Sequence, residues 1–278
     1  MNKTVGLNNL GNTCFLNSGL QMLLLNNDFC KIILENKSIS DNLGIMAKFI
    51  EDYKSSNQKS ISPDKIKKIV EIRKPIFKGT KQHDSSEFVL ALMEILNDDL
   101  KGKLDEIFKI TSKTIIKCKY KTCLRESETS ETNNFLILPI NDESTNLDDC
   151  YRKYKVHELL EGEEMYQCEK CNEKRIASKT LKVESWSNNL IIIIKRFINK
   201  NSKNNKDIDI PIDWRHDFTI KGAIFHSGNI GGGHYIYLSK NINGMWTIYD
   251  DSITSEITEN KAQGYLNKAY ILYYVKKS

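Results

Sequence analysis

The sequence of 278 residues lacks several features that would place it among membrane, secreted or nucleic-acid-binding proteins. No apolar run approaches the ~20 residues that a membrane-spanning helix needs. The first ten residues lack the apolar core of a signal peptide. No internal repeat is evident. We therefore expect a soluble intracellular protein of the cytoplasm or nucleus, with no membrane partner.

The sequence also has little excess of charge of either sign. Lysine and arginine (41 residues) exceed aspartate and glutamate (36) by only five charges, and the excess is spread along the chain. The stretch 199–207 is basic and polar, but it has no interleaved aromatic residues that could stack on bases. A basic zinc-ribbon protein that binds nucleic acid would concentrate its cations on one face. We expect no nucleic-acid partner.

The chain has seven cysteines, an odd number. A disulfide framework would pair them, whereas a reducing compartment leaves thiols available for catalysis and for metal ions. The count favours a catalytic thiol together with metal ligands.

Cys14 lies between a loop rich in glycine and asparagine and an apolar helical run, in the stretch GLNNLGNTCFLNSG. Free backbone N–H groups and the helix dipole stabilise negative charge at a helix N-terminus. We expect this position to favour the thiolate, the form of cysteine that attacks carbonyl groups. The alternative is a small buried cysteine with a packing role.

His234 follows three glycines (231–233) at the start of an apparent strand, and Asp250 and Asp251 end a later one, MWTIYDD. Cysteine, histidine and carboxylate are the parts of a nucleophile, a base and a group that orients the base. Adjacent strand residues point to opposite faces, so only one aspartate can easily serve. The pattern predicts a thiol hydrolase.

Helical patterns occupy the first part of the chain and strand patterns the rest, which predicts an α+β fold. Helices are expected over 15–25, 43–53 and 84–100, with a further start at Ser62-Pro63-Asp64. Asp84 and Glu87 have the spacing of a capping box. Strands are expected from about residue 108 onward, in the segments 114–118, 135–140, 175–183, 190–197, 235–238 and 269–275.

Four other cysteines form two pairs, Cys118-KYKT-Cys123 and Cys168-EK-Cys171. The second pair has the spacing of a zinc knuckle, and zinc sites tolerate the wider spacing of the first. We expect one structural zinc ion held by all four thiolates, the alternative being a decayed site with free thiols. Cys30 and Cys150 are expected to be ordinary packing or surface residues.

These motifs together resemble the ubiquitin-specific proteases, a family of papain-like cysteine deubiquitinases. GLNNLGNTCFLNS resembles the family's cysteine box, and GGGHYIYL with WTIYDD resembles its histidine box. KQHDSSEFVLALMEIL, LIIIIKRF and YQCEKC resemble three further family segments, in the family's order. The resemblance implies a single catalytic domain with a helical thumb (about 1–105), zinc-binding fingers (about 106–185) and a β-rich palm (about 186–278).

The resemblance also implies catalytic roles. His234 would take the thiol proton and later protonate the leaving amine. Asp250, the first aspartate of its pair, would accept the other ring N–H of the histidine. Asn9 matches the family's oxyanion donor, and the backbone N–H of Cys14 would be the second donor. For Asn9 the alternative is a turn residue in its loop.

Ubiquitin ends in an extended Leu-Arg-Leu-Arg-Gly-Gly tail, and the resemblance implies a narrow, acidic channel for it. Asp84 matches the family residue that meets the tail's arginines, with Glu87 as a candidate helper. Gln82 matches a position beside the cleft. Gly233 would allow the Gly-Gly end to approach closely, and Tyr235 would line the channel.

The sequence thus predicts a monomeric deubiquitinase whose partner is ubiquitin or its conjugates, with structural zinc and no catalytic cofactor. Two alternatives remain open. One is a protease for a ubiquitin-like modifier with the same Gly-Gly ending. The other is an inactive ubiquitin-binding module, against which the presence of Cys14, His234 and Asp250 argues.

Overall fold

The computed structural model describes residues 4–155, 157–199, 202–229, 232–241 and 243–277. Gly231, the first of the three glycines before His234, and residues 200–201 of the basic stretch lie outside the described residues. The helices are α1 (Cys14–Leu24), α2 (Asn27–Glu35), α3 (Asp41–Ser55), α4 (Asp64–Arg73), α5 (Ser85–Asp99), α6 (Asp105–Phe108), α7 (Leu147–Tyr154) and α8 (Glu259–Leu266), with 3-10 turns at Pro75–Phe77 and Gly162–Glu164.

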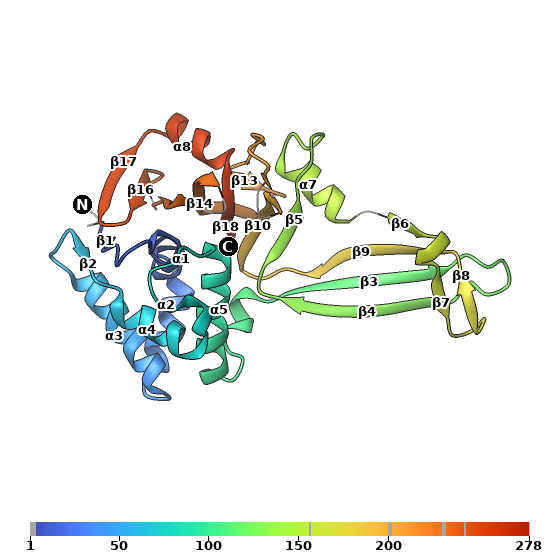
Figure 1. Cartoon of the computed structure of the whole chain (residues 1–278), viewed down its shortest axis with the longest axis horizontal. Coiled ribbons are helices and arrows are strands. Elements are labelled where there is room, and N and C mark those ends of the chain that lie inside the picture. Colours follow the sequence, from blue (N-terminus) through green and yellow to red (C-terminus); the bar gives the residue numbers. More distant parts are fainter. Residues whose placement is uncertain (1–3, 156, 200–201, 230–231, 242, 278) are drawn as a thin grey trace.

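The strands are β1 (Gly6–Leu7), β2 (Ser60–Ile61), β3 (Ile110–Cys118), β4 (Glu126–Asn133), β5 (Leu136–Pro139), β6 (His157–Leu160), β7 (Tyr166–Cys168), β8 (Glu173–Arg175), β9 (Ala177–Ser185), β10 (Asn189–Lys195), β11 (Phe197–Asn199), β12 (Ser202–Lys203), β13 (Asp213–Trp214), β14 (Phe218–Asn229), β15 (Gly232–Lys240), β16 (Trp246–Asp250), β17 (Ile253–Ile257) and β18 (Ala269–Lys276). Helices α1 to α6 gather at one end, a broad sheet packs against them, and a narrow sheet extends away as an arm (Figure 1).

The predicted N-terminal cap of α5 is confirmed. The Asp84 carboxylate accepts the backbone N–H groups of Ser86 and Glu87, at 2.7 and 3.4 Å. Among the described residues, the Glu87 side chain does not accept the backbone N–H of Asp84, so the capping box is only half formed. At α4 the sequence predicts Ser62 as the cap and Pro63 as the first helical residue, but in the structure Pro63 takes the cap position and Asp64 is the first helical residue.

The broad sheet explains the run of isoleucines in β10. Its strand order is β17-β16-β15-β14-β18-β10-β5, with β13 paired to β14. Ile191 and Ile193 pack into the core formed with the helices α1 to α5, whereas Leu190, Ile192 and Ile194 pack into the core beneath α7 and α8. A strand buried on both faces needs apolar residues at successive positions.

The arm is a four-stranded antiparallel sheet in the order β4-β3-β9-β6, with the β7–β8 hairpin near its far end (Figure 1). Much of its surface is polar, and Lys113 bonds both Glu128 and Glu184 at 2.9 Å. Exposed ion pairs contribute only about 0–1 kcal/mol each. The tip of the arm therefore needs another source of stability.

The structure confirms the α+β class, and it contains helices that the periodicity of the sequence did not predict. Helices α2, α7 and α8 are short, but each begins at a capping side chain, Asn26, Asn146 and Thr258. Those caps were the available signal. The division of the chain near residues 105 and 185 stays a prediction. No helix in the described ranges has the length and apolar content to span a membrane.

Candidate active site

Cys14 is the first residue of α1, at the end of a tight loop. Gly11 and Asn12 both have positive φ angles (97° and 53°), a conformation that glycine and asparagine tolerate best. This turn places Cys14 at the helix start, where the residue is only 3% exposed.

His234 and Asp250 come together on neighbouring strands. His234 lies near the start of β15 and Asp250 at the end of β16, and the Nε2 atom of the ring lies 2.6 Å from Asp250 Oδ1. This bond leaves Nδ1 as the ring nitrogen that can face a thiol. The carboxylate fixes the orientation of the ring in the manner that thiol and serine hydrolases require.

The Cys14 thiol has hydrogen-bond partners other than His234. Gln82 Nε2 donates to Sγ at 3.6 Å, and the backbone N–H of Tyr235 is also within hydrogen-bonding reach. Among the described residues no hydrogen bond joins Sγ to His234. Burial raises the pKa of the Cys14 thiol, and this effect outweighs the donors that lower it. The expected preference for thiolate at the helix start is therefore not met in this state.

Asn9 is held by the loop and by Asp251. Its Oδ1 atom accepts the backbone N–H groups of Gly11 and Thr13, at 2.9 and 3.2 Å. Its Nδ2 atom donates to Asp251 Oδ2 at 2.8 Å, and Asn17 Nδ2 donates to Asp251 Oδ1 at 2.7 Å. The second N–H of the Asn9 amide has no hydrogen-bond partner among the described residues and stays available. Sequence reasoning left Asp251 without a role.

Gln82 bridges the helical part of the chain and the broad sheet. It accepts the backbone N–H of Gly233 at 3.0 Å and donates to the carbonyl oxygen of the same residue. A Cβ atom at Gly233 would lie 2.2 Å from His226 Nε2 and 2.4 Å from the carbonyl oxygen of Ser227. Packing against these two residues therefore requires glycine at position 233, and the expected close approach of a Gly-Gly tail stays a prediction.

Asp84 and Glu87 occupy different environments. The Asp84 carboxylate accepts the hydroxyl of Tyr270 at 2.9 Å and that of Tyr235 at 3.4 Å, besides the Ser86 hydroxyl at 2.6 Å. With the two backbone donors, these bonds fill its acceptor sites. Glu87 is an exposed residue, but its carboxylate is partly desolvated by its neighbours. This desolvation, together with the nearby Asp84 charge, raises the pKa of Glu87. Glu87 is thus the more available carboxylate.

The four predicted metal cysteines meet at the tip of the arm. The sulfur atoms of Cys118, Cys123, Cys168 and Cys171 lie within 4.8 Å of one another, and three of these residues are buried. The Cys123 and Cys168 sulfurs are 3.6 Å apart. A tetrahedral zinc ion with Zn–S bonds of about 2.3 Å requires sulfurs about 3.8 Å apart. The donor set and its spacing fit one structural zinc ion.

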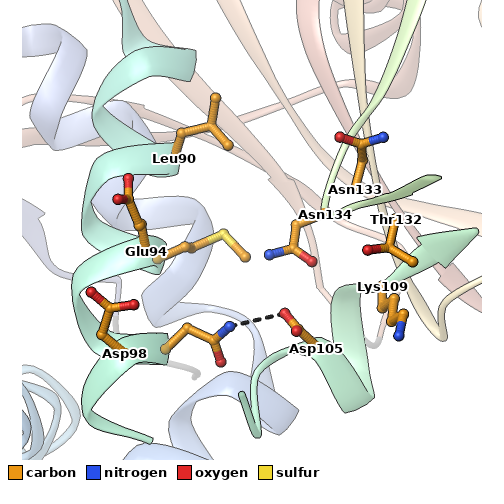
Figure 2. Close-up of a pocket in the computed structure, with 10 residues that line it drawn as sticks. Leu90, Glu94, Asp98, Asp105, Lys109, Thr132, Asn133 and Asn134 are labelled. Carbon is orange, nitrogen blue, oxygen red and sulfur yellow. Dashed lines mark hydrogen bonds between the residues drawn. The ribbon is translucent and has the colours of Figure 1, made fainter. Parts of the chain in front are cut away.

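A polar cavity of about 310 Å³ lies further along α5, where the arm meets the helices (Figure 2). It is lined by the outer face of α5, by α6 and by the end of β4. Asn97 Nδ2 donates to Asp105 Oδ1 across it at 2.9 Å. The lining residues are Leu90, Met93, Glu94, Asn97, Asp98, Asp105, Lys109, Thr132, Asn133 and Asn134.

Comparison of the sequence with protein families identifies the family of this chain. The profile of the family described as ubiquitin carboxyl-terminal hydrolase matches residues 5–274, nearly the whole chain. The chain belongs to the ubiquitin carboxyl-terminal hydrolase family. The resemblance found in the sequence motifs is confirmed.

Individual members of the ubiquitin carboxyl-terminal hydrolase family are distant from this chain. Ubiquitin carboxyl-terminal hydrolases 4 and 5 of Saccharomyces cerevisiae (strain ATCC 204508 / S288c) are each 26% identical to it, over 97% of this chain and 39% and 44% of their own lengths. Ubiquitin carboxyl-terminal hydrolase Usp2 of Drosophila melanogaster is 24% identical over 97% of this chain and 34% of its own length. The chain therefore spans less than half the length of these relatives.

Proposed function

We propose that this chain is a thiol-dependent deubiquitinase that hydrolyses the isopeptide or peptide bond after the C-terminal Gly-Gly of ubiquitin. The observation that supports this proposal most is the contact between α1, which carries Cys14, and β15, which carries His234. The Cys14 thiol faces the backbone of the residue that follows His234, and His234 is bonded to Asp250. This is the constellation of a nucleophile, a base and an orienting carboxylate.

In the proposed reaction, His234 Nδ1 takes the proton of the Cys14 thiol, and the thiolate attacks the carbonyl carbon of the terminal glycine. The oxyanion receives hydrogen bonds from the backbone N–H of Cys14 and from the remaining N–H of Asn9. His234 then protonates the leaving lysine amine, which departs as the thioester forms. Water, deprotonated by His234, cleaves the thioester and releases the ubiquitin carboxylate and the free thiol.

We assign the tail channel to the space between α5 and β15. Glu87, exposed and without an ion-pair partner among the described residues, would meet an arginine of the tail. Asp84 would act mainly by holding Tyr235 and Tyr270 in place. The helices would then be the thumb, the arm the fingers and the broad sheet the palm. The globular part of ubiquitin would rest between them.

Zinc in this proposal is structural. Cys118, Cys123, Cys168 and Cys171 would hold it, and four thiolates leave no open position for chemistry. The ion would cross-link the polar tip of the fingers. We also propose an intracellular setting, which suits seven free cysteines, and a monomer.

One observation favours an alternative, an inactive ubiquitin-binding module: the described residues contain no hydrogen bond between Cys14 and His234. A protease for a ubiquitin-like modifier with a Gly-Gly ending would use the same residues. The test is hydrolysis of ubiquitin and of such modifiers, each carrying a C-terminal fluorogenic amide, by the wild type and by Cys14→Ala. We expect turnover of the ubiquitin substrate by the wild type alone. Binding without turnover by the wild type would support the inactive module.

A further inference from the structure

One edge of β15 beside the nucleophile has no strand partner among the described residues. β15 pairs with β14 from Gly232 to Ser239, but with β16 only from Tyr237 onward. The backbone N–H groups of Gly233 and Tyr235 both point to this open edge, because alternate residues of a strand direct them to the same side. Gln82 accepts the N–H of Gly233, and the Cys14 sulfur lies within reach of the N–H of Tyr235.

The side chain of Gln82 occupies the edge as a peptide group would. A primary amide has a carbonyl acceptor and N–H donors, like a peptide bond. Its Oε1 atom accepts the N–H of Gly233 at 3.0 Å and its Nε2 atom donates to the carbonyl oxygen of Gly233. Two reciprocal bonds to one residue are the pattern that an added antiparallel strand would make.

The same amide covers the nucleophile. Nε2 of Gln82 also donates to Cys14 Sγ at 3.6 Å, and Cys14 as a whole residue is only 3% exposed. An extended substrate tail could not reach the edge at Gly233 while this side chain is there. The tail brings the same donors and acceptors through its own backbone, so it can replace both bonds that it breaks.

We propose that Gln82 is a gating residue: in the free enzyme its side-chain amide takes the place of a substrate peptide group on β15, and the Gly-Gly tail displaces it. The identity of the displacing tail rests on the proposed function, whereas the gate itself rests on the contacts of Gln82 alone. A residue that only bound the tail would weaken tail binding when removed. A gating residue instead gives the tail and other reagents easier access to Cys14 when removed.

The test compares the zinc-loaded wild type with Gln82→Ala and Gln82→Met, since methionine keeps the length of the side chain without the amide. Gln263→Ala is the matched control. Gln263 is a half-buried glutamine of α8 whose amide also donates to a backbone carbonyl, that of Ile210, far from the channel. Alkylation of Cys14 by iodoacetamide is followed by peptide mass across pH. The midpoint of the profile reports the thiol pKa, and the plateau at high pH reports access to the thiol.

We expect both Gln82 variants to raise the plateau about fivefold to tenfold, the effect of losing two neutral hydrogen bonds, and the control to match the wild type. A midpoint shift with an unchanged plateau would overturn the gate, because Gln82 would then act only on the thiolate. Unchanged profiles in both variants would overturn it as well. Melting temperatures equal to that of the wild type establish that the variants are folded.

The second arm uses the peptide Leu-Arg-Gly-Gly amide to protect Cys14 from alkylation. Displacement of Gln82 predicts protection of Gln82→Ala at about fivefold lower peptide concentration than the wild type. Weaker protection of the variant would overturn the proposal, because Gln82 would then bind the tail. A raised plateau without protection of any variant supports the gate and counts against the Gly-Gly substrate of the proposed function.

Discussion

Asn9 and Asp251 lie 242 positions apart in the sequence, and the Asn9 side-chain amide donates to the Asp251 carboxylate at 2.8 Å. The neighbouring Asp250 bonds His234 instead. Asp251 has a left-handed backbone conformation, with φ of 51°, so the two adjacent carboxylates diverge toward different partners. One aspartate orients the proposed base, His234, and the other orients the candidate oxyanion donor, Asn9.

This division predicts an order among three variants. Asp250→Ala should lower kcat by about 10³–10⁴-fold, because the histidine loses its orienting partner. Asn9→Ala should lower kcat by about 10²–10³-fold through loss of one oxyanion donor. Asp251→Ala should cost less than Asp250→Ala, since the Asp251 carboxylate contacts Asn9 and Asn17 and not the histidine. Steady-state hydrolysis of a ubiquitin amide measures all three.

The double variant Asn9→Ala/Asp251→Ala is the control for that pathway. It should resemble Asn9→Ala alone, because two residues that act through one hydrogen bond are not additive. Additive losses, or a larger loss for Asp251→Ala than for Asp250→Ala, would contradict the assignment.

The two carboxylates of the α5 start should separate in their effects. Glu87→Gln should raise KM for ubiquitin substrates about tenfold with little change in melting temperature, because it removes only an exposed charge from the proposed tail channel. Asp84→Ala should lower the free energy of unfolding by about 1–3 kcal/mol, since it removes a helix cap and leaves tyrosine hydroxyls without their acceptor.

Glu35→Gln is the matched control for charge, because Glu35 is exposed on α2, away from the channel. It should leave both KM and the melting temperature unchanged. An unchanged KM in Glu87→Gln, or an unchanged stability in Asp84→Ala, would remove the corresponding role.

The four cysteines at the tip of the arm predict one zinc ion per chain by elemental analysis of the purified protein. Cys168→Ser should lose the ion and lower the melting temperature, because the buried cluster then lacks its cross-link. Cys150→Ala is the control, since Cys150 is buried elsewhere and outside the cluster. It should keep the full zinc content. Absence of zinc from the wild type would remove the metal assignment.

The sequence predicted those parts of the site that depend on local spacing. The cap at Asp84 and the pairing of Cys168 with Cys171 are features of a few consecutive residues, so local rules find them. The Asn9–Asp251 bond depends on side-chain packing between distant elements, which no local rule contains. The burial that raises the pKa of Cys14 likewise arises only once Gln82 and β15 cover the helix start.

His226 predicts a dependence of stability on pH. The residue is 3% exposed, and burial, helped by the nearby Lys203 and His234 charges, lowers the pKa of its ring to about 4. The unfolded chain has an ordinary histidine pKa of about 6.5 and therefore binds the proton more tightly between these values. Stability should fall by up to about 3 kcal/mol as pH drops from about 6.5 to 4.

His226→Phe is the comparison, because phenylalanine keeps a ring against Tyr235 without a titrating group. Denaturant unfolding of both proteins across this pH range gives the two slopes. The variant should lose less stability on acidification than the wild type, whatever its stability at pH 7. Parallel slopes would show that His226 is not the group responsible.

The most direct test of the central claim is reaction with a ubiquitin whose C-terminus carries an electrophile, read by intact mass for the wild type and for Cys14→Ala. We predict a single ubiquitin adduct on the wild type and none on Cys14→Ala, with ubiquitin binding by the variant close to normal. No adduct on folded wild-type protein, or an equal adduct on the variant, would contradict the assignment of Cys14 as the nucleophile of a deubiquitinase.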